Sequence, residues 1–497
     1  MITQEIDFGG QRLMKLIDLV RNLPGEYQIL GDENVTVDSL STDSRKITEG
    51  CLFFCISGLH FDAHNFAPDA VRKGAKALVA ERRVDADCPQ ILVKNVRFAM
   101  SYIAAAFYGN PADKMKIIGI TGTKGKTTTS FLLKSILECA GHKVGLIGTV
   151  CTLIGNEERS SGKTTPDPVE FQEILSDMAK AGVTHVVMEV SAHALHMHRV
   201  AGVRFAASAF TNFSQDHLDY FKTMDAYMDA KMMIFEQSEN VTINVDDERI
   251  LKAAKERKKD FVRIGIRESA DVYAKEIEFT EKGLTFSLCF HKRMRLNVSM
   301  RMTGIFNVYN ALVAATLADI VGVDADSIKQ GLEKLQSVPG RIELLDTNTP
   351  YRVILDYAHS PDALENILSA VRETSKGRLI SLFGCGGGRD QMKRPIMGEI
   401  SGRLADLSII TSDNPRDEQP LDIIQAIVEG IEPTGGEYVV IENRREAIRY
   451  ALSIAKESDS VVLAGKGHET YQEIQGVKMP FDEKVVVQEL LEEAGVM

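Results

Sequence analysis

A glycine-rich segment between an apolar strand and a helix constrains the fold more than any other part of the sequence. The run Gly-Ile-Thr-Gly-Thr-Lys-Gly-Lys-Thr-Thr at 119–128 follows a predicted strand at 117–120 and leads into a predicted helix at 127–140. Glycines let a backbone wrap around phosphate oxygens, and the amides at a helix N-terminus face the anion. Lys126 adds a positive charge, and the Thr127 hydroxyl can bind Mg²⁺. The segment therefore predicts a nucleoside triphosphate site, formed by Gly122, Thr123, Lys124, Gly125, Lys126, Thr127 and Thr128.

Strand and helix signals alternate along most of the chain. A length of 497 residues is enough for about three domains, and turn residues at 108–111 and a Pro-Gly pair at 339–340 interrupt the pattern. The predicted domains are residues 1–112, 113–338 and 339–497. We expect an α/β fold throughout, with a small mixed α/β N-terminal domain, a central P-loop ATPase-like parallel sheet and a C-terminal doubly wound, Rossmann-like domain.

Apolar periodicity predicts the individual elements. Helices are predicted at 13–23, 69–76, 127–140 and 307–321, and strands at 51–56, 77–80, 117–120, 144–147, 183–190, 353–356, 379–383, 407–411 and 460–464. Residues 285–302 alternate like antiparallel strands.

Composition excludes several classes of partner. The formal net charge of -12 argues against a general electrostatic grip on nucleic acid. Seven cysteines without a C-x-x-C pair indicate reduced thiols in a cytoplasmic protein rather than a disulfide framework or a thiolate metal site. No apolar run is long enough to span a membrane, so no membrane association is expected.

A carboxylate and an imidazole follow two predicted strands of the central domain. Glu189 ends the strand at 183–190, and His217 lies about 30 residues further on, in Thr-Asn-Phe-Ser-Gln-Asp-His at 211–217. Side chains at the carboxyl edge of a parallel sheet sit where Mg²⁺ would bridge the phosphates of ATP. Either residue alone is more often a surface or hydrogen-bonded group, so the prediction depends on their coincidence with the phosphate loop.

The loop Gly-Thr-Lys-Gly-Lys-Thr-Thr at 122–128 resembles the ATP loop of the Mur ligases and of the related folylpolyglutamate synthetases. Further motifs in a fixed order extend the resemblance to the Mur ligases from Thr42 to Glu469. The resemblance implies that Glu189 and His217 bind Mg²⁺ and that Lys231 is carbamylated, which turns a cation into an anionic ligand. Without the resemblance, Lys231 would be expected to be an exposed helix lysine.

The resemblance also implies the substrate contacts. Those to a UDP-muramoyl-dipeptide are Ser44, Arg45, His60, Thr164, Thr165, Ser191 and Arg199. Those to ATP outside the loop are Asn307, Arg341, His359 and Lys393. Ala192, Ala194 and Met197 depart from the residues that are common in the family around Ser191.

The tetrapeptide Asp-Asn-Pro-Arg at 413–416 marks the amino-acid site in ligases of this type. Its arginine goes with meso-diaminopimelate, whose distal carboxylate a guanidinium can bind through two hydrogen bonds. The implied amino-acid contacts are Arg389, Asp413, Asn414, Pro415, Arg416, Gly465 and Glu469. Taken alone, Arg416 and Glu469 would be read as a solvated ion pair.

The resemblance thus implies an ATP-dependent ligase of peptidoglycan synthesis. Lys126, Glu189, His217 and Lys231 would support transfer of the γ-phosphoryl group to the D-glutamate γ-carboxylate of UDP-N-acetylmuramoyl-L-Ala-D-Glu, and diaminopimelate would attack the acyl phosphate. The enzyme is expected to be a monomer. The alternatives are a ligase that adds lysine or another diamino acid, a folylpolyglutamate synthetase, or, in a different class, a nucleotide-dependent switch; an oxidoreductase is weaker because no G-x-G-x-x-G follows a strand.

Overall fold

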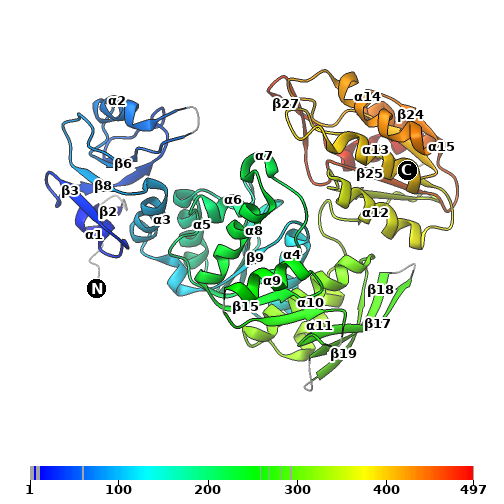
Figure 1. Ribbon diagram of the computed structural model, residues 1–497, viewed down its shortest axis with the longest axis horizontal. Helices are drawn as coiled ribbons and strands as arrows, with labels where there is room; N and C mark the ends of the chain where they lie inside the picture. The colour runs from blue at the N-terminus through cyan, green and yellow to red at the C-terminus, as the bar shows by residue number, and fades with distance from the viewer. Residues whose placement is uncertain are drawn as a thin grey trace. The chain divides into compact units, whose positions relative to one another are not determined.

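A computed structural model describes residues 5–6, 12–58, 61–257, 259–267, 269–280, 283–290 and 294–495 (Figure 1). The chain forms two compact units. Unit 1 comprises Met1–Thr123, Ala140–Ile243 and Glu248–Val262, and unit 2 comprises Lys124–Cys139, Asn244–Asp247 and Arg263–Met497. Across the described ranges, no helix combines the length and the apolar character needed to cross a membrane.

Unit 1 begins with a five-stranded sheet that buries both of its faces. Its strand order is β3 (Tyr27–Leu30), β8 (Gln90–Val93), β7 (Ala77–Ala80), β6 (Cys51–Phe54) and β5 (Ser39–Ser41). Side chains alternate between the faces of a strand, so Leu52 and Phe54 pack towards α1 (Leu16–Val20) and α3 (Val96–Phe107), whereas Phe53 packs towards α2 (Ala67–Arg72). A separate three-stranded sheet is formed by β1 (Glu5–Ile6), β2 (Arg12–Lys15) and β4 (Thr36–Val37).

The second sheet of unit 1 is largely parallel. Its strands run in the order β12 (Glu157–Ser160), β11 (Cys151–Ile154), β10 (Val144–Ile147), β13 (His185–Glu189), β9 (Lys116–Thr121), β14 (Phe205–Phe210) and β15 (Ser238–Asn244). Neighbours from β10 to β15 pair in parallel, and only β11 and β12 are antiparallel. The helices of this part are α5 (Pro168–Lys180), α6 (Ala192–His196), α7 (Leu218–Phe221), α8 (Met224–Met232) and α9 (Glu248–Glu256). The central strand β9 is buried from its second residue onward, as a strand covered on both faces must be.

Unit 2 opens with α4 (Lys126–Cys139), which packs against α10 (Ile305–Ile320) and α11 (Ala325–Lys334). Gly331 makes that packing close, because a Cβ there would come within 2.3 Å of the Ile136 backbone. The strands of this part are β16 (Val262–Gly265), β17 (Val272–Thr280), β18 (Gly283–Phe290) and β19 (Met294–Met300). β17, β18 and β19 pair antiparallel, as the alternation at 285–302 predicts.

The last part of unit 2 is a doubly wound sheet. Its order is β20 (Glu343–Leu344), β21 (Arg352–Asp356), β25 (Ser460–Ala464), β22 (Leu379–Phe383), β23 (Leu407–Ile410) and β24 (Tyr438–Val440), parallel except at β20. One core joins this sheet to α12 (Pro361–Thr374), α13 (Lys393–Leu404) and α14 (Pro420–Ile431), and a second core joins it to α15 (Arg444–Ile454) and α16 (Glu483–Glu493). A two-stranded hairpin, β26 (Tyr471–Ile474) and β27 (Val477–Pro480), precedes α16.

The predicted α/β class is therefore confirmed, with a parallel central sheet and a Rossmann-like C-terminal sheet. The strands at 77–80, 144–147, 379–383 and 460–464 have the predicted bounds. The helix predicted at 13–23 is wrong in its first half, because Met14 pairs with Val37 as part of β2 and the helix α1 begins only at Leu16. Long-range strand pairing overrides local periodicity there. The helix predicted at 69–76 lies earlier, at Ala67–Arg72, because Pro68 starts it.

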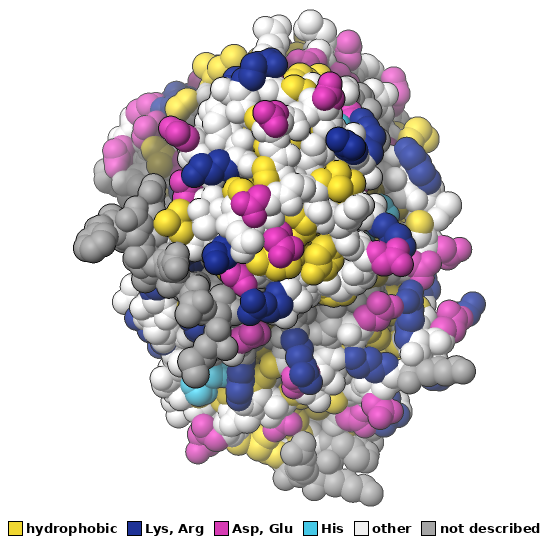
Figure 2. Space-filling model, turned by 90° about the vertical axis from the view of Figure 1, so that its left-hand side faces the viewer, with side chains coloured by type: hydrophobic (Ala, Val, Ile, Leu, Met, Phe, Trp, Pro, Cys, Tyr) yellow, Lys and Arg dark blue, Asp and Glu magenta, His cyan; other side chains and the backbone are white. Residues whose placement is uncertain are grey.

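Two features of the described structure relate to the composition of the chain. All seven cysteines are unpaired thiols. On the face drawn in Figure 2, basic and acidic side chains are interspersed rather than separated into one large basic patch.

Candidate functional site

The glycine-rich loop follows β9 and is fixed against the segment after β14. Gly122 has φ 147°, and a Cβ at this position would lie 1.9 Å from Thr211 Oγ1, so the close approach requires glycine. Thr123 donates its backbone N–H to Asn212 O at 2.9 Å and its hydroxyl to Ser214 O at 3.2 Å. These contacts hold the first half of the predicted phosphate loop inside unit 1.

The second half of the loop opens α4 in unit 2. Gly125, with φ 81°, makes the turn, and the helix starts at Lys126. Thr129 Oγ1 donates to Asn310 Oδ1 at 3.3 Å, and Asn310 Nδ2 donates to Asn307 Oδ1 at 3.0 Å. This chain of side chains ties Asn307, a predicted ATP contact, to the first turn of α4.

Glu189, a predicted metal ligand, lies at the carboxyl end of β13 and is 1% exposed. Its Oε1 accepts from Thr149 N at 2.9 Å and its Oε2 from Thr149 Oγ1 at 3.0 Å. Thr149 Oγ1 is also 3.0 Å from Thr164 Oγ1. Thr165 Oγ1 donates to the backbone oxygen of Glu189 at 2.9 Å and accepts from Ser191 N at 3.1 Å. The structure thus gathers three predicted sugar-peptide contacts around the predicted metal ligand.

Arg199 belongs to the same cluster. Its Nη1 donates to Thr165 O at 2.9 Å, and its Nε is 3.1 Å from Asp167 Oδ1. The side chain is 15% exposed, so these bonds hold the guanidinium in one orientation at the surface of the cluster.

Lys231 is 1% exposed, which contradicts the surface position expected of a helix lysine without the family resemblance. Its Nζ donates to Gly122 O at 2.7 Å and lies 4.6 Å from the centre of the Tyr227 ring. Burial of an amine beside the phosphate loop is costly and is typical of a functional lysine.

His217 is half-exposed and has a left-handed backbone with φ 54°. Its ring centre lies 4.8 Å from that of His193. Within the described residues, no group of three or more His, Cys, Asp and Glu side chains is arranged to hold a metal.

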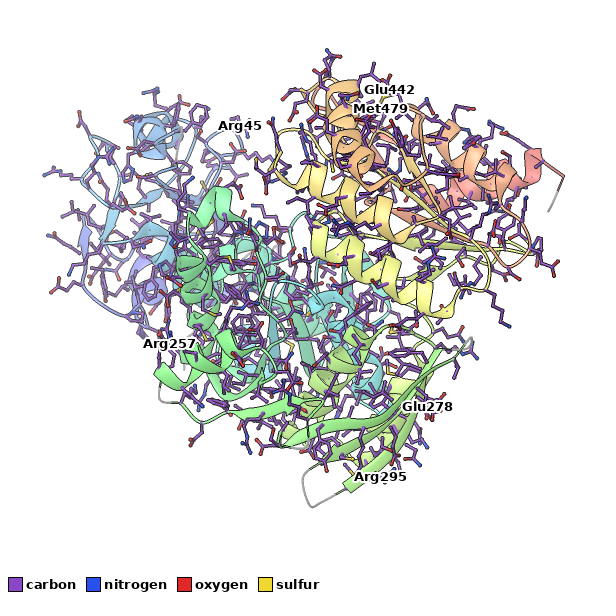
Figure 3. All side chains as sticks on the ribbon, turned by 45° about the vertical axis from the view of Figure 1, so that its right-hand side comes forward. Arg45, Arg257, Glu278, Arg295, Glu442 and Met479 are labelled. Carbon is purple, nitrogen blue, oxygen red and sulfur yellow. The ribbon has the colours of Figure 1, made fainter. Side chains whose placement is uncertain are left out.

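Two residues predicted to contact the UDP-muramoyl-dipeptide, Ser44 and Arg45, follow β5. Arg45 extends from this loop and is 86% exposed (Figure 3), with its Nη2 at 2.9 Å from Asp43 Oδ2. The Arg45 guanidinium holds the pKa of Asp43 well below its ordinary value. Ser44 O accepts from Lys73 Nζ at 3.2 Å. His60 lies outside the described residues.

Three residues predicted to contact ATP, Arg341, His359 and Lys393, lie near the carboxyl end of β21. The Arg341 guanidinium lies 4.9 Å from the centre of the Tyr357 ring. Burial raises the pKa of Asp356, and the Arg341 charge opposes this rise. His359 Nδ1 is 2.8 Å from Tyr357 O, and Lys393 Nζ donates to His359 O at 2.7 Å.

The predicted amino-acid contacts come together between the ends of β23 and β25. Asn414 Nδ2 donates to Glu469 Oε2 at 2.9 Å. Asp413 is 8% exposed, and its buried Oδ2 has no hydrogen-bond partner. A Cβ at Gly465 would come within 2.6 Å of that oxygen, so the close approach of these two residues requires glycine.

The neighbouring loop after β22 reaches the same place. A Cβ at Gly386 would lie 3.0 Å from Arg416 Nη1 and 4.0 Å from Arg389 Cγ. Arg389 is exposed, whereas Pro415 is buried, with its carbonyl oxygen against Gly387.

Sequence reasoning missed three residues of these clusters. Lys466 is fully buried, and its Nζ donates to Asn414 Oδ1 at 3.2 Å and to Glu469 Oε2 at 3.1 Å. Thr149 supplies both donors to Glu189, and Glu473 pairs with Arg416. Lys466 lies between the predicted contacts Gly465 and Glu469, in the segment Gly-Lys-Gly-His-Glu at 465–469, and could have been found there. Thr149 and Glu473 carry no signal in the sequence.

Family models match three successive parts of the chain. The Mur ligase family catalytic domain matches residues 36–108, the Mur ligase middle domain residues 120–318, and the Mur ligase glutamate ligase domain residues 340–467.

Curated relatives match nearly the whole chain. UDP-N-acetylmuramoyl-L-alanyl-D-glutamate–2,6-diaminopimelate ligase 1 of Clostridium acetobutylicum is 47% identical, over 97% of this chain and 100% of its own length. The ligase of that name from Halalkalibacterium halodurans is 42% identical, over 97% and 99%.

A solved structure of a UDP-N-acetylmuramoyl-L-alanyl-D-glutamate–2,6-diaminopimelate ligase matches with a TM-score of 0.69 and 30% identity, over 97% of this chain and 99% of that chain. The folylpolyglutamate synthase of Mycobacterium tuberculosis, at 17% identity, a TM-score of 0.60 and 75% and 93% coverage, shares the fold alone. The matched family models and the full-length relatives together establish that this chain belongs to the Mur ligase family.

Proposed function

We propose that this chain is the ATP-dependent ligase that joins meso-diaminopimelate to the D-glutamate γ-carboxylate of UDP-N-acetylmuramoyl-L-Ala-D-Glu. As a Mur ligase it forms amide bonds at the expense of ATP. The observation that carries the choice of amino acid is the cluster of Asp413, Asn414, Arg416 and Glu469, which presents both signs of charge to one substrate. Relatives that bear the diaminopimelate ligase name over their full length support the same choice.

The phosphate loop is proposed to hold the triphosphate of ATP. Amides at the start of α4 and the charge of Lys126 would stabilise the negative charge that spreads over the transferring phosphoryl group. A γ-carboxylate oxygen attacks the γ-phosphorus, the bond to the β-phosphate oxygen breaks, and an acyl phosphate and ADP form. A carboxylate oxygen does not leave as oxide, but after phosphorylation the same oxygen can leave as part of phosphate.

The muramoyl-dipeptide is proposed to lie against the Glu189 cluster. The hydroxyls of Thr164, Thr165 and Ser191 can bond sugar and peptide groups, and Arg199 can pair with a carboxylate. Ser44, Arg45 and His60 are proposed contacts to the uridine end. Because Arg199 is already fixed by Thr165 and Asp167, little side-chain entropy would be lost when substrate binds.

Magnesium is proposed to bind at Glu189, His217 and Lys231. Each Glu189 oxygen accepts one hydrogen bond from Thr149, which leaves further lone pairs for a hard cation. Lys231 fits this set only as a carbamate, because an ammonium repels a cation. Thr127 is the proposed ligand from the phosphate loop. When bound, Mg²⁺ would neutralise charge on the phosphate oxygens.

The amino-acid cluster is proposed to present the attacking amine. Asp413 Oδ2 is buried without a partner, so it can accept from an ammonium group. Glu469 can accept from the distal ammonium and Arg416 can donate to the distal carboxylate. The ammonium first loses a proton to water; the free amine then attacks the acyl carbon, the tetrahedral adduct expels phosphate, and the nitrogen loses a second proton to solvent.

Phosphate release tests the proposal. Purified protein with ATP, Mg²⁺ and the muramoyl-dipeptide should release phosphate with meso-diaminopimelate and far less with lysine, whereas a folate with glutamate should give none. Lys126→Ala should abolish release, and Arg416→Ala should raise the KM for diaminopimelate about tenfold or more while the KM for ATP stays unchanged. Equal rates with lysine and diaminopimelate, or an unaffected Lys126→Ala enzyme, would contradict it.

We further propose that the enzyme acts as a monomer in the cytoplasm. Its proposed substrates ATP and a UDP-linked precursor and its seven unpaired thiols support this location. Sedimentation of the purified chain would test the oligomeric state.

A further inference from the structure

The hairpin formed by β26 and β27, residues Tyr471–Pro480, packs against the proposed amino-acid site. It follows the Gly-Lys-Gly-His-Glu segment directly and lies beyond residue 467, where the match to the family model ends. No role for the hairpin follows from the sequence. It makes hydrogen bonds to the tetrapeptide Asp413–Arg416.

The hairpin fixes the backbone of Arg416. Arg416 N donates to Glu473 O at 3.1 Å, and Gln475 N donates to Arg416 O at 2.9 Å. Arg416 has φ 51°, a left-handed conformation that is unfavourable for a residue with a side chain. Such a conformation persists where surrounding contacts hold it, and those contacts often serve a site. Here the contacts come from the hairpin.

The hairpin also holds the residues before Arg416. Gln472 Nε2 donates to Asp413 O at 2.6 Å, and Glu473 N donates to Asn414 Oδ1 at 2.9 Å. Asn414 is thereby oriented with its Nδ2 towards Glu469. Each residue of the tetrapeptide that is proposed to touch the amino acid through its side chain therefore has a bond to the hairpin.

The Glu473 carboxylate orients the Arg416 guanidinium. Glu473 Oε2 lies 3.1 Å from Arg416 Nε, and Arg416 Nη1 donates to Gly387 O at 2.7 Å. A guanidinium has five N–H groups in a rigid plane, so these two bonds set the plane and leave three N–H groups for a substrate carboxylate. The two side chains are only about a quarter exposed, at 26% and 25%. Solvent therefore competes less for this pair than for a surface ion pair.

We propose that the hairpin Tyr471–Pro480 is the specificity element of the amino-acid site, and that Glu473 is a positioning residue that aims Arg416 at the distal carboxylate of the substrate. This inference rests on the proposed function. An amino acid without a distal carboxylate, such as lysine, gains nothing from an aimed guanidinium. Loss of the Glu473 carboxylate should therefore weaken diaminopimelate binding selectively.

Glu473 has two opposite effects on the binding of a substrate carboxylate to Arg416. Its negative charge partly neutralises Arg416 and competes with a substrate carboxylate, which would weaken binding. Its bond to Nε also fixes a side chain that otherwise has many rotamers, which strengthens binding. Because a hydrogen bond to a charged group depends steeply on geometry and three N–H groups remain, we expect orientation to outweigh competition.

The test compares variants of Glu473 in the full-length enzyme by phosphate release. Glu473→Ala should raise the KM for diaminopimelate about tenfold, while kcat and the KM for ATP change by less than about twofold. Glu473→Gln keeps an acceptor for Arg416 Nε and should recover most of this loss. The matched control is Glu489→Ala, which removes a glutamate of α16 that pairs with Arg445 of α15. This variant should leave every kinetic constant unchanged.

Each outcome bears on one claim. An unchanged or lower KM for diaminopimelate in Glu473→Ala, or an equal rise in the KM for ATP, overturns the positioning role. If circular dichroism shows that Glu473→Ala does not fold, Glu473→Asp replaces it, because the shorter side chain cannot reach Arg416 Nε. An unchanged KM for diaminopimelate in Glu473→Asp also overturns the positioning role. Absence of any phosphate release by the unaltered enzyme with diaminopimelate would instead refute the proposed function.

Discussion

Replacement of Arg444 by methionine should destabilise the C-terminal sheet strongly. Arg444 and Glu483 form an ion pair with both side chains 0% exposed, in which Arg444 Nε donates to Glu483 Oε1 at 2.7 Å. Arg444 also donates to Ala464 O at 2.9 Å and to Ser412 O at 3.4 Å. Arg444→Met fills the volume but leaves Glu483, whose Oε2 already lacks a partner, as an uncompensated buried carboxylate.

Removal of one partner from a buried pair costs about 3–5 kcal/mol. With a urea dependence of about 2 kcal/mol per molar, the unfolding midpoint should fall by about 2 M. Circular dichroism is the suitable probe, because the chain has no tryptophan. The double variant Arg444→Met with Glu483→Leu should recover most of the loss, since neither buried charge remains.

The same variant should acquire a distinctive dependence on pH. Burial already raises the pKa of Glu483, and Arg444 opposes this rise, so Arg444→Met should raise the pKa further. The folded state then binds the proton more tightly than the unfolded state, and stability falls as pH rises through the interval between the two pKa values. The loss of unfolding free energy caused by Arg444→Met, measured against the unaltered chain, should therefore be smaller near pH 5 than near pH 8. A loss below about 1 kcal/mol, or a double variant no better than the single one, would refute the reasoning.

Three further predictions concern single positions. Gly465→Ala places a Cβ 2.6 Å from Asp413 Oδ2 at φ 116°, so it should raise the KM for the amino acid about tenfold in the phosphate-release assay, and an unchanged KM would count against the cluster. Thr149→Val removes one of the two donors to Glu189 and should increase the Mg²⁺ concentration for half-maximal activity about tenfold in a magnesium titration. Burial lowers the pKa of His185 to about 4, so the unfolded state binds the extra proton first and stability should fall as pH drops from about 6.5 towards 4. His185→Leu should abolish that part of the acid sensitivity in urea titrations; persistence of the full sensitivity would assign it to other groups.

The elements that the sequence predicts well are those buried on both faces. The strands at 379–383 and 460–464 are apolar except for Ser381 and Ser460, and both are buried along their whole length. The region 13–23 could not be predicted, because the partner that makes residues 12–15 a strand lies about twenty residues away. Contact between distant segments is not a local property of either segment.

The residues of the candidate site also differ in whether a local sequence pattern could predict them. Gly122 and Arg416 lie in motifs whose amino-acid sequence indicates their chemistry. The burial of Lys231, the two donors that Thr149 gives Glu189, and the pairing of Glu473 with Arg416 all depend on tertiary placement. No pattern of spacing could reveal them. The roles of these residues and the bounds of the three domains remain predictions.

Four parallel strands of the C-terminal sheet, β21, β22, β23 and β25, end at one edge, and each continues into a loop that carries a different part of the proposed site. The two helix layers stabilise the sheet from its faces and do not require any particular loop sequence at that edge. The proposed contacts to ATP and to the amino acid can therefore diverge one loop at a time, so that substrate preference could change while the framework keeps its fold. The hairpin after β25 (Met479 is labelled in Figure 3) is one of these modules, because its two strands form a sheet of their own that is joined to the loop after β23 by backbone hydrogen bonds to Arg416.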